Sequence, residues 1–417
     1  MRSRFFSVRS AFLMLTMLLA IPALALVQQP RKESLLNGMK VLMFPNIGSD
    51  RAWVRIRVHS GSAFDPQGKE GLMQMLAANF FPTDAAKEYF RDELGGSLEI
   101  TANYDYIEVD ASSKPESLVP MLETLSGGVV NNVIDKDTTA KLRSDMLAKI
   151  KQLEADPNYV ADQAASKRLF GTFPYGRPVY GTETSIKNID NFDLSNAKQR
   201  FLTADNSTMA ISGNFQPTRA MPAVKRYFGG WVKANKKIPA TFRQPDDPDT
   251  KRLTIELPGL EYDYERWARK APARIDKDYA AALVYADISA GCGYEYHPYL
   301  LTGLWLRHRQ VKSGELPING RNTCVNLEAK DSPPPVSTGE ATIVFDFFDS
   351  AKARVIGRFS APGSTEEHWL DMDTFGLGSP EAQVEALKAV TLADVTNFAR
   401  RLYAYPTASV AVETPAK

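Results

Sequence analysis

The chain has few of the side chains that bind metals or form covalent bonds. Its 417 residues include only two cysteines and four histidines. No two histidines lie three or four residues apart and no Cys-x-x-Cys pair occurs, which excludes the common short zinc motifs built on either residue. Cys292 and Cys324 are expected either to form one disulfide or to remain two buried thiols.

The chain also lacks an excess of charge of one sign. Its 50 Lys and Arg residues and 49 Asp and Glu residues give a formal net charge of +1. Nucleic acids and anionic membrane surfaces are bound by clustered basic side chains, so we expect neither as a partner. With 44% hydrophobic and 24% charged residues, the composition is typical of a globular protein, and the length indicates two or three domains.

The sequence contains no long apolar run. A short one occurs near the N-terminus. Three arginines precede an acid-free apolar run over residues 11–20, and the small-residue triplet Ala23-Leu24-Ala25 follows. This is the pattern of a secretory signal peptide, and the run is short for a membrane span. We therefore expect residues 1–25 to be a signal peptide, leaving a periplasmic or otherwise exported protein with no stable membrane span. An uncleaved anchor is the alternative.

The residues after this segment, 31–235, alternate between strand and helix patterns. Apolar residues with a period of two predict strands, and apolar residues three or four apart predict helices. By these criteria we expect strands at 35–44, 53–59, 97–109 and 205–213, and helices at 69–81 and 137–153.

A charged, proline-containing segment at residues 236–250 is expected to link this domain to a second one, residues 251–417. The second domain repeats the order of patterns, which indicates an internal duplication. We expect an α+β fold of two homologous domains, each a mainly antiparallel sheet packed with helices. In the second domain strands are expected at 252–257, 342–347 and 408–412, and helices at 276–290, 300–310 and 380–402.

Five strings in the first domain carry a family resemblance. They are "LLNGMKVLMFPN", "VHSGSAFDPQGKEGLMQMLAANFF", "LGGSLEITANYDYIEV", "FPYGRPVYGTETSI" and "DNSTMAISGNF". In this order and spacing they resemble the insulinase-type (M16) peptidase family, in particular its mitochondrial processing peptidase group. The resemblance is clear over residues 33–230. It is weaker over residues 251–417, where "AALVYADISA", "LWLRHRQ" and "VTLADVTNFARRLY" carry it.

The resemblance implies a zinc-binding helix that reads H-x-x-E-H, with a further acidic ligand from a later helix. In this chain the three helix positions are Gln74, Ala77 and Ala78, and the later ligand falls at Ala148 or Lys149. An amide is a poor zinc ligand, a methyl group is none, and an ammonium group repels a dication. The sequence therefore predicts neither zinc nor a general base here, and the helix of residues 69–81 is expected to be a core helix.

The histidines offer no replacement for this site. His297 and His308 lie eleven residues apart around the helix expected at 300–310, and we do not expect them to bind a metal.

Two further positions are implied to contact substrate. Family members carry an Arg and, seven residues later, a Tyr in the second half; here these positions are Arg307 and Gly314. Arg307 is read either as a ligand for a peptide carbonyl or carboxylate, or as a solvated or salt-bridged arginine. The family also binds extended peptides along a strand edge, which falls at Glu99-Ile100-Thr101-Ala102. Glu99 and Ile100 depart from the family's usual Asn-Ala at this edge.

The resemblance to the family, together with the absence of its zinc ligands and general base, predicts a non-catalytic M16-like subunit. Such a subunit is expected to be exported and to pair with an active zinc M16 peptidase, forming the chamber for peptide proteolysis. No cofactor is expected in this chain, and zinc is expected only in the partner. One alternative is a standalone peptide-binding or chaperone-like protein that holds peptide or unfolded polypeptide along residues 99–102. The other is an active metallopeptidase with a displaced zinc site.

Overall fold

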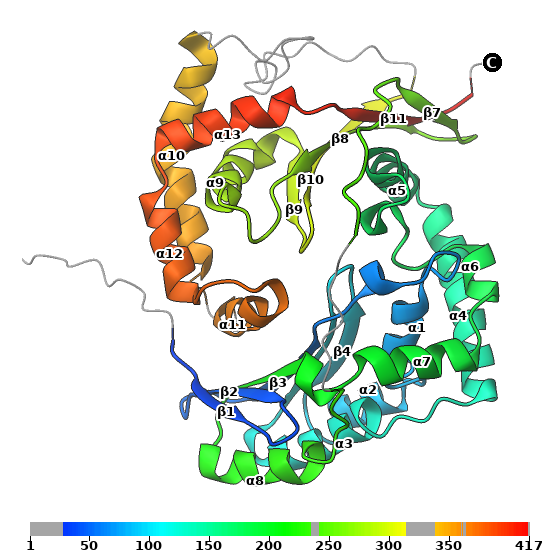
Figure 1. The fold of residues 1–417 in the computed structure, drawn as a ribbon, viewed down its shortest axis with the longest axis vertical. Coiled ribbons are helices and arrows are strands. Elements are labelled where there is room, and N and C mark those ends of the chain that lie inside the picture. The colour runs from blue at the N-terminus through cyan, green and yellow to red at the C-terminus, as the bar shows by residue number, and fades with distance from the viewer. Residues whose placement is uncertain (1–27, 235–241, 314–337, 360, 362–363, 416–417) are drawn as a thin grey trace, which may run out of the picture.

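The structure is a computed structural model that describes residues 28–234, 242–313, 338–359, 361 and 364–415. The signal segment expected at residues 1–25 lies outside the described residues. So does Cys324, and the disulfide with Cys292 stays a prediction. The described residues form two β-sheets packed with helices (Figure 1), which confirms the expected α+β class.

The first sheet, sheet A, has six strands in the order β1-β2-β6-β3-β5-β4, and only β2 and β6 run parallel. In β3, Val54, Ile56 and Val58 join the core while Arg55 and Arg57 point to the opposite face, as their alternation predicts. The strands are β1 (Arg31–Ser34), β2 (Lys40–Pro45), β3 (Ala52–Val58), β4 (Ser97–Ala102), β5 (Ile107–Ser113) and β6 (Ser207–Gly213).

Helices of the first half, except α5 (Pro157–Phe170), which packs against the second sheet, cover one face of sheet A (Figure 1) and bury a single large apolar core against it. The expected helices at 69–81 and 137–153 are present as α1 and α4. The full set is α1 (Leu72–Ala78), α2 (Ala85–Asp92), α3 (Leu118–Val129), α4 (Lys136–Glu154), α5 (Pro157–Phe170), α6 (Glu183–Lys187), α7 (Asn191–Phe201) and α8 (Pro217–Phe228).

The second sheet, sheet B, has five strands in the order β7-β11-β8-β10-β9, and only β7 and β11 run parallel. Its strands are β7 (Leu253–Glu256), β8 (Tyr262–Ala271), β9 (Tyr294–Pro298), β10 (Gly303–Lys312) and β11 (Ala408–Glu413). The helices of this half are α9 (Tyr279–Ser289), α10 (Thr338–Phe359), α11 (Ser364–Phe375), α12 (Pro380–Ala389) and α13 (Leu392–Ala404).

The two sheets match strand for strand. The order β2-β6-β3-β5-β4 in sheet A corresponds to β7-β11-β8-β10-β9 in sheet B, and the parallel pair occupies the same place in each. Strand β1 is the addition in sheet A. Shared order and shared strand directions support the internal duplication inferred from the repeated sequence patterns.

The helix expected at residues 300–310 is wrong, because this segment is strand β10. It pairs with β8 over its whole length and with β9 over half of it. Both of its faces are covered: Leu304 and Leu306 pack toward the first half and Trp305 packs under the helices of the second. The first four residues of β10 are buried on both faces, so this part of the strand lacks the polar–apolar alternation that would distinguish a strand from a helix in sequence.

Two other assignments in the second half also need correction. The strand expected at 342–347 lies within helix α10, whose later residues Ala351, Val355 and Phe359 are buried at a spacing of four. The helix expected at 380–402 is two helices, because the chain is extended at Thr391. There the Thr391 hydroxyl accepts a hydrogen bond from the Asp394 N–H at 3.2 Å and begins α13.

Candidate functional site

Helix α1 carries the three positions at which the family resemblance places zinc chemistry. The Asp65 carboxylate holds its first turn by accepting the N–H groups of Gly71 at 2.8 Å and Met73 at 2.9 Å. Gly71 has a φ of 92°, and a Cβ there would lie 2.8 Å from the Tyr180 carbonyl oxygen, so only glycine fits. Burial raises the pKa of Asp65 to about 8.

The chemical positions on α1 are occupied by side chains that cannot bind a metal. Gln74 and Ala78 lie one turn apart and are half-buried, whereas Ala77 is only 3% exposed. The Gln74 side-chain oxygen is buried without a hydrogen-bond partner among the described residues. The apolar residues Leu72 and Met75 belong to the core. Helix α1 is therefore packed as a core helix.

Helix α4 supplies no acidic group to complete such a site. Met146 and Ile150 face the core, whereas Ala148 and Lys149 are exposed. Within the described ranges, no group of three or more His, Cys, Asp or Glu residues is arranged to hold a metal ion. An amide, two methyl groups and an exposed ammonium do not fit zinc, so no step that uses zinc is derived for this chain.

Strand β4 contains the predicted peptide-binding residues and lies at one end of sheet A as the structure describes it. Ile100 and Ala102 pack against the core, and Glu99 and Thr101 are exposed on the other face. Helix α1 packs beside β4, so the fold places the predicted peptide-binding strand next to the helix that carries Gln74, Ala77 and Ala78. An edge strand offers backbone groups to which an extended chain can add.

Arg307 lies in the other half of the molecule, on strand β10 rather than on a helix. Its guanidinium carbon is 5.2 Å from the ring centre of Trp267 and 5.3 Å from that of Tyr294. Both rings are its direct neighbours across the sheet, on β8 and β9. Arg307 and β4 therefore belong to different sheets.

His297 and His308 are closer together than sequence spacing suggested, since they lie on paired strands. Both approach the Glu295 carboxylate, His297 at 3.2 Å and His308 at 3.7 Å. His308 also faces Asp162 of helix α5 at 3.8 Å. Burial, helped by the charge of Arg266, lowers the pKa of His308. This cluster lies where α5 meets sheet B. It was not predicted from the sequence, because residues 300–310 were expected to form a helix.

The string "FPYGRPVYGTETSI", the most specific part of the resemblance, forms a joint between the two halves. The Tyr175 hydroxyl donates to Asp105 at 2.7 Å and accepts the Leu301 N–H at 3.0 Å. Asp105 also accepts the Leu300 N–H at 3.1 Å. Burial raises the pKa of Asp105 to about 6. The tight turns β4–β5 and β9–β10 thus meet through one buried tyrosine.

A second contact between the halves is ionic. Arg57 of β3 is fully buried and donates to Glu108 and to Asp371 of α11, each at 2.6 Å. Arg274 of the second half donates to the other oxygen of Asp371. These charges raise the pKa of Arg57, although its burial opposes the shift. These two polar contacts join the halves together with the apolar core that α5 shares with sheet B.

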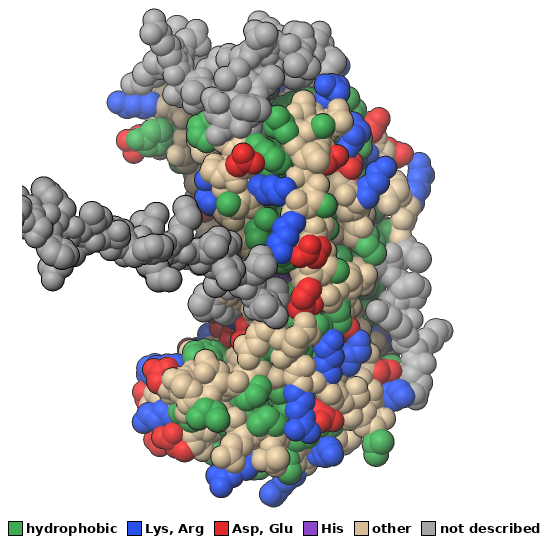
Figure 2. All heavy atoms as spheres, turned by 90° about the vertical axis from the view of Figure 1, so that its left-hand side faces the viewer, with side chains coloured by type: hydrophobic (Ala, Val, Ile, Leu, Met, Phe, Trp, Pro, Cys, Tyr) green, Lys and Arg blue, Asp and Glu red, His purple; other side chains and the backbone are tan. Residues whose placement is uncertain are grey.

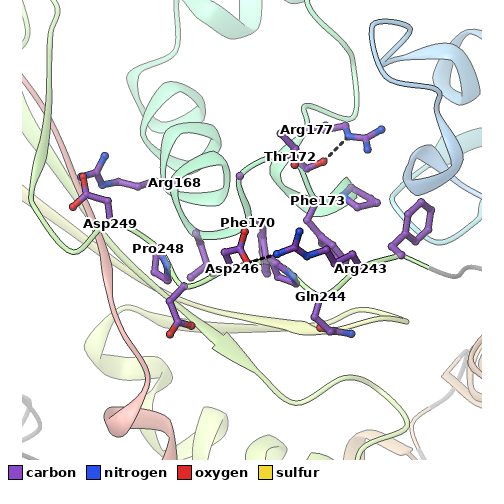
Figure 3. Close-up of a pocket in the computed structure, with 16 residues that line it drawn as sticks. Arg168, Phe170, Thr172, Phe173, Arg177, Arg243, Gln244, Asp246, Pro248 and Asp249 are labelled. Carbon is purple, nitrogen blue, oxygen red and sulfur yellow. Dashed lines mark hydrogen bonds and ion pairs between the residues drawn. The ribbon is translucent and has the colours of Figure 1, made fainter.

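A cavity of about 350 Å³ lies between the end of α5 and residues 242–249, which lead into sheet B (Figure 3). Its arginines already bind the protein: Arg168 pairs with Asp249 at 2.9 Å, and Arg243 donates to Asp246 at 3.0 Å. Arg177 donates to the carbonyl oxygen of Thr172 at 3.2 Å. Of these contacts, the Arg168–Asp249 pair ties the segment 242–249 to the first half.

The surface carries charges of both signs. On the face drawn in Figure 2, basic and acidic side chains alternate with apolar ones, and neither sign covers a large area. Of the helices that the structure describes, none has both the length and the apolar character needed to cross a membrane.

Comparison with known proteins supports the family resemblance. A family model described as the peptidase M16 inactive domain matches residues 188–289. An uncharacterized zinc protease of Bacillus subtilis is 22% identical over 246 residues, which cover 55% of this chain and 59% of that protein. A probable mitochondrial-processing peptidase subunit beta of Arabidopsis thaliana is 22% identical over 205 residues, covering 48% of this chain and 39% of that protein. The chain thus spans less than two thirds of the length of these curated relatives.

Solved structures share the fold over nearly the whole chain. A protease from Helicobacter pylori has a TM-score of 0.76 at 13% identity, covering 93% of this chain and all of that one. A peptidase M16 inactive domain from Pseudomonas fluorescens has a TM-score of 0.74 at 17% identity, covering 93% of this chain and 98% of that one. At these identities the likeness establishes the fold alone.

Proposed function

This chain is related to the M16 peptidases, and we propose that it is a non-catalytic, exported subunit that pairs with an active zinc M16 peptidase. In this proposal the partner supplies zinc and base, and this chain forms part of the wall of the peptide chamber. The zinc positions on α1 and α4 hold side chains without metal affinity, so hydrolysis by that route is not available to the chain alone.

The observation that supports the proposal most directly is a well-packed helix α1 that lacks metal-binding side chains at the positions where the family resemblance places them. Asp65 and Gly71 still build the first turn of α1, and the helix still packs beside β4. Gln74, Ala77 and Ala78 occupy the positions where the resemblance places the chemical residues, and the packing positions of the helix are apolar. A frame of this kind needs a role other than catalysis, and shaping a partner's chamber is the simplest one.

The names of similar proteins support pairing without specifying a partner. One relative is named as a subunit of a mitochondrial-processing peptidase, and another as a cytochrome b-c1 complex reductase subunit from Candida albicans. One solved structure is titled as an M16 inactive domain. These names describe those proteins, and we carry only the idea of an assembly over to this chain.

Co-expression with an H-x-x-E-H protein encoded beside this chain tests the proposal. We expect the two to co-purify as a complex with one zinc per pair, and replacing the partner's first zinc-binding His by Ala should remove the metal but not the pairing. Mass measurement by light scattering gives the stoichiometry. Only separate monomers at micromolar concentration would contradict the proposal.

The β4 edge favours a second candidate function, in which the chain alone binds extended or unfolded peptide. A labelled unfolded peptide mixed with the isolated chain should then show raised fluorescence anisotropy, and exchange protection should appear at Glu99–Ala102. Unchanged anisotropy at high chain concentration would exclude it. Metal analysis of the same preparation tests the displaced-zinc alternative, since stoichiometric zinc in the isolated chain would overturn both proposals.

A further inference from the structure

The helix-covered face of sheet B contains an unusual group of side chains, which we call the arginine–tyrosine patch: Trp267, Arg269, Tyr294, Arg307 and Tyr403. The pairing register places the first four on one face, because Arg307 lies opposite both Trp267 and Tyr294, and Arg269 lies opposite Trp305. Arg269 and Arg307 are thus diagonal neighbours, a position in which side chains about 7 Å apart interact. Tyr403 reaches the patch from α13, which lies along this sheet (Figure 1).

Arg269 has aromatic neighbours instead of acidic ones. Its guanidinium carbon lies 4.8 Å from the ring centre of Tyr403, and its Nε is buried without a hydrogen-bond partner. No carboxylate among the described residues forms an ion pair with it. Burial lowers the pKa of Arg269, and the charge of Arg307 adds to this effect while nearby tyrosines oppose it. A half-buried cation without a counter-ion is costly in a folded protein.

Neighbouring arginines show that the fold supplies counter-ions elsewhere. Arg309, two residues beyond Arg307 on the same face, pairs with Glu265 on β8. Arg266, on the opposite face, pairs with Asp162. Arg274 pairs with Asp371. Arg269 differs from all three, although it is half-buried and remains in reach of solvent.

We propose that the arginine–tyrosine patch is a binding site for a carboxylate group, held by Arg269 with Arg307 beside it. A guanidinium fork matches the two oxygens of a carboxylate, and the surrounding rings lower the local dielectric and strengthen the contact. The half-buried Tyr403 can give an additional donor, since its hydroxyl accepts a hydrogen bond from the fully buried Tyr285 at 3.3 Å. The proposal extends the proposed function by naming a chemical group that the chain binds, and it does not require the pairing.

A carboxylate can reach this site from two sources. One is a bound peptide, through its C-terminus or an acidic side chain. The other is this chain, whose segment 314–337 contains Glu315, Glu328 and Asp331 in sequence. The same guanidinium chemistry serves both, and an experiment with two versions of the chain separates them.

The test measures binding of a labelled hexapeptide with a free C-terminal carboxylate, compared with the same peptide ending in an amide. The full chain is titrated, alongside a variant with Glu315→Gln, Glu328→Gln and Asp331→Asn. We expect Arg269→Met to weaken carboxylate binding by about 10-fold or more, the usual effect of losing a charge-assisted hydrogen bond. Arg269→Lys should retain part of the affinity, and Arg243→Gln, a remote exposed control, should bind as the original chain does.

Preference for the carboxylate peptide in the original chain, lost in Arg269→Met, supports a peptide ligand. If the carboxylate peptide is preferred only by the variant that lacks Glu315, Glu328 and Asp331, the site is filled by a carboxylate of this chain itself. Equal binding of acid and amide peptides in both chains, or no effect of Arg269→Met, overturns the proposal. A second readout excludes a merely structural role: without ligand, Arg269→Met should raise the melting temperature of the triple variant, because it removes a half-buried charge that has no counter-ion. Each result stands whether or not the chain pairs with a peptidase.

Discussion

The two halves of this molecule share a strand order but differ in what their helix-covered sheet faces carry. In sheet A that face is apolar, with Val54 and Ile56 on β3 and Val109 on β5. In sheet B the corresponding strands, β8 and β10, present Arg269 and Arg307 beside aromatic rings. In the first half, helix α1, where the family resemblance places zinc chemistry, is packed into the core. The second half keeps charged, half-buried side chains, and recognition by this chain is therefore expected there.

The joint between the halves gives the largest expected effect. Asp371→Ala leaves the guanidinium groups of Arg57 and Arg274 buried without their shared carboxylate. Removing one partner of a buried ion pair costs about 3–5 kcal/mol, so the free energy of unfolding should fall by that amount. Urea denaturation measures it. Asp246→Ala is the matched control, because Asp246 pairs with Arg243 on the surface and its loss should cost under about 0.5 kcal/mol. Equal effects of the two variants would contradict a buried ionic joint.

Helices α1 and α4, which carry the predicted zinc positions, should respond differently to a substitution of Ala by Glu. Ala77→Glu, which restores the family residue, puts a carboxylate at a position that is only 3% exposed. We expect a loss of about 3 kcal/mol in the free energy of unfolding, since a buried charge without a partner is costly. Ala148→Glu on the exposed side of α4 should change it by less than about 0.5 kcal/mol. If Ala77→Glu is tolerated equally well, the first half is still an open site rather than a core.

The first half was predicted from sequence better than the second. Strands such as β3 alternate clearly, because one face meets helices and the other carries Arg55 and Arg57. The zinc positions on α1 could be found only because the flanking strings resemble a family. In the second half, β10 is covered on both faces, and its pattern gives no period to distinguish strand from helix. The patch around Arg269 was missed because it depends on the pairing of β8 with β10, which no local pattern specifies.

The buried tyrosine joint should make stability depend on pH. The pKa of Asp105 is raised to about 6, above its usual value near 4, so the folded state favours the protonated carboxyl. Its contribution is therefore fully present below pH 4 and is lost as pH rises through 6. We expect the free energy of unfolding of the original chain, relative to Asp105→Asn, to fall by roughly 2 kcal/mol between pH 4 and 7.

Urea denaturation of both chains over this pH range measures the difference. Tyr175→Phe is a useful companion, because it removes the hydroxyl that donates to Asp105 and leaves the ring in place. This variant should shift the midpoint of the pH dependence upward. A constant difference between the original chain and Asp105→Asn would show that the carboxyl titrates normally.

The edge of sheet A should show the smallest effect. Glu99 on β4 lies opposite Asp110 on β5, so two carboxylates face each other across the strands. Like charges in this position destabilise a sheet, but Arg55 pairs with Asp110 at 2.8 Å and already neutralises one of them. Glu99→Lys should therefore stabilise the chain by only about 0.5 kcal/mol, and Glu99→Gln by about half of that. A much larger gain would mean that the edge is held in a strained state, as expected of a strand that is completed by a peptide or a partner. A gain within this small range leaves the β4 edge an ordinary surface strand and directs attention to the arginines of sheet B.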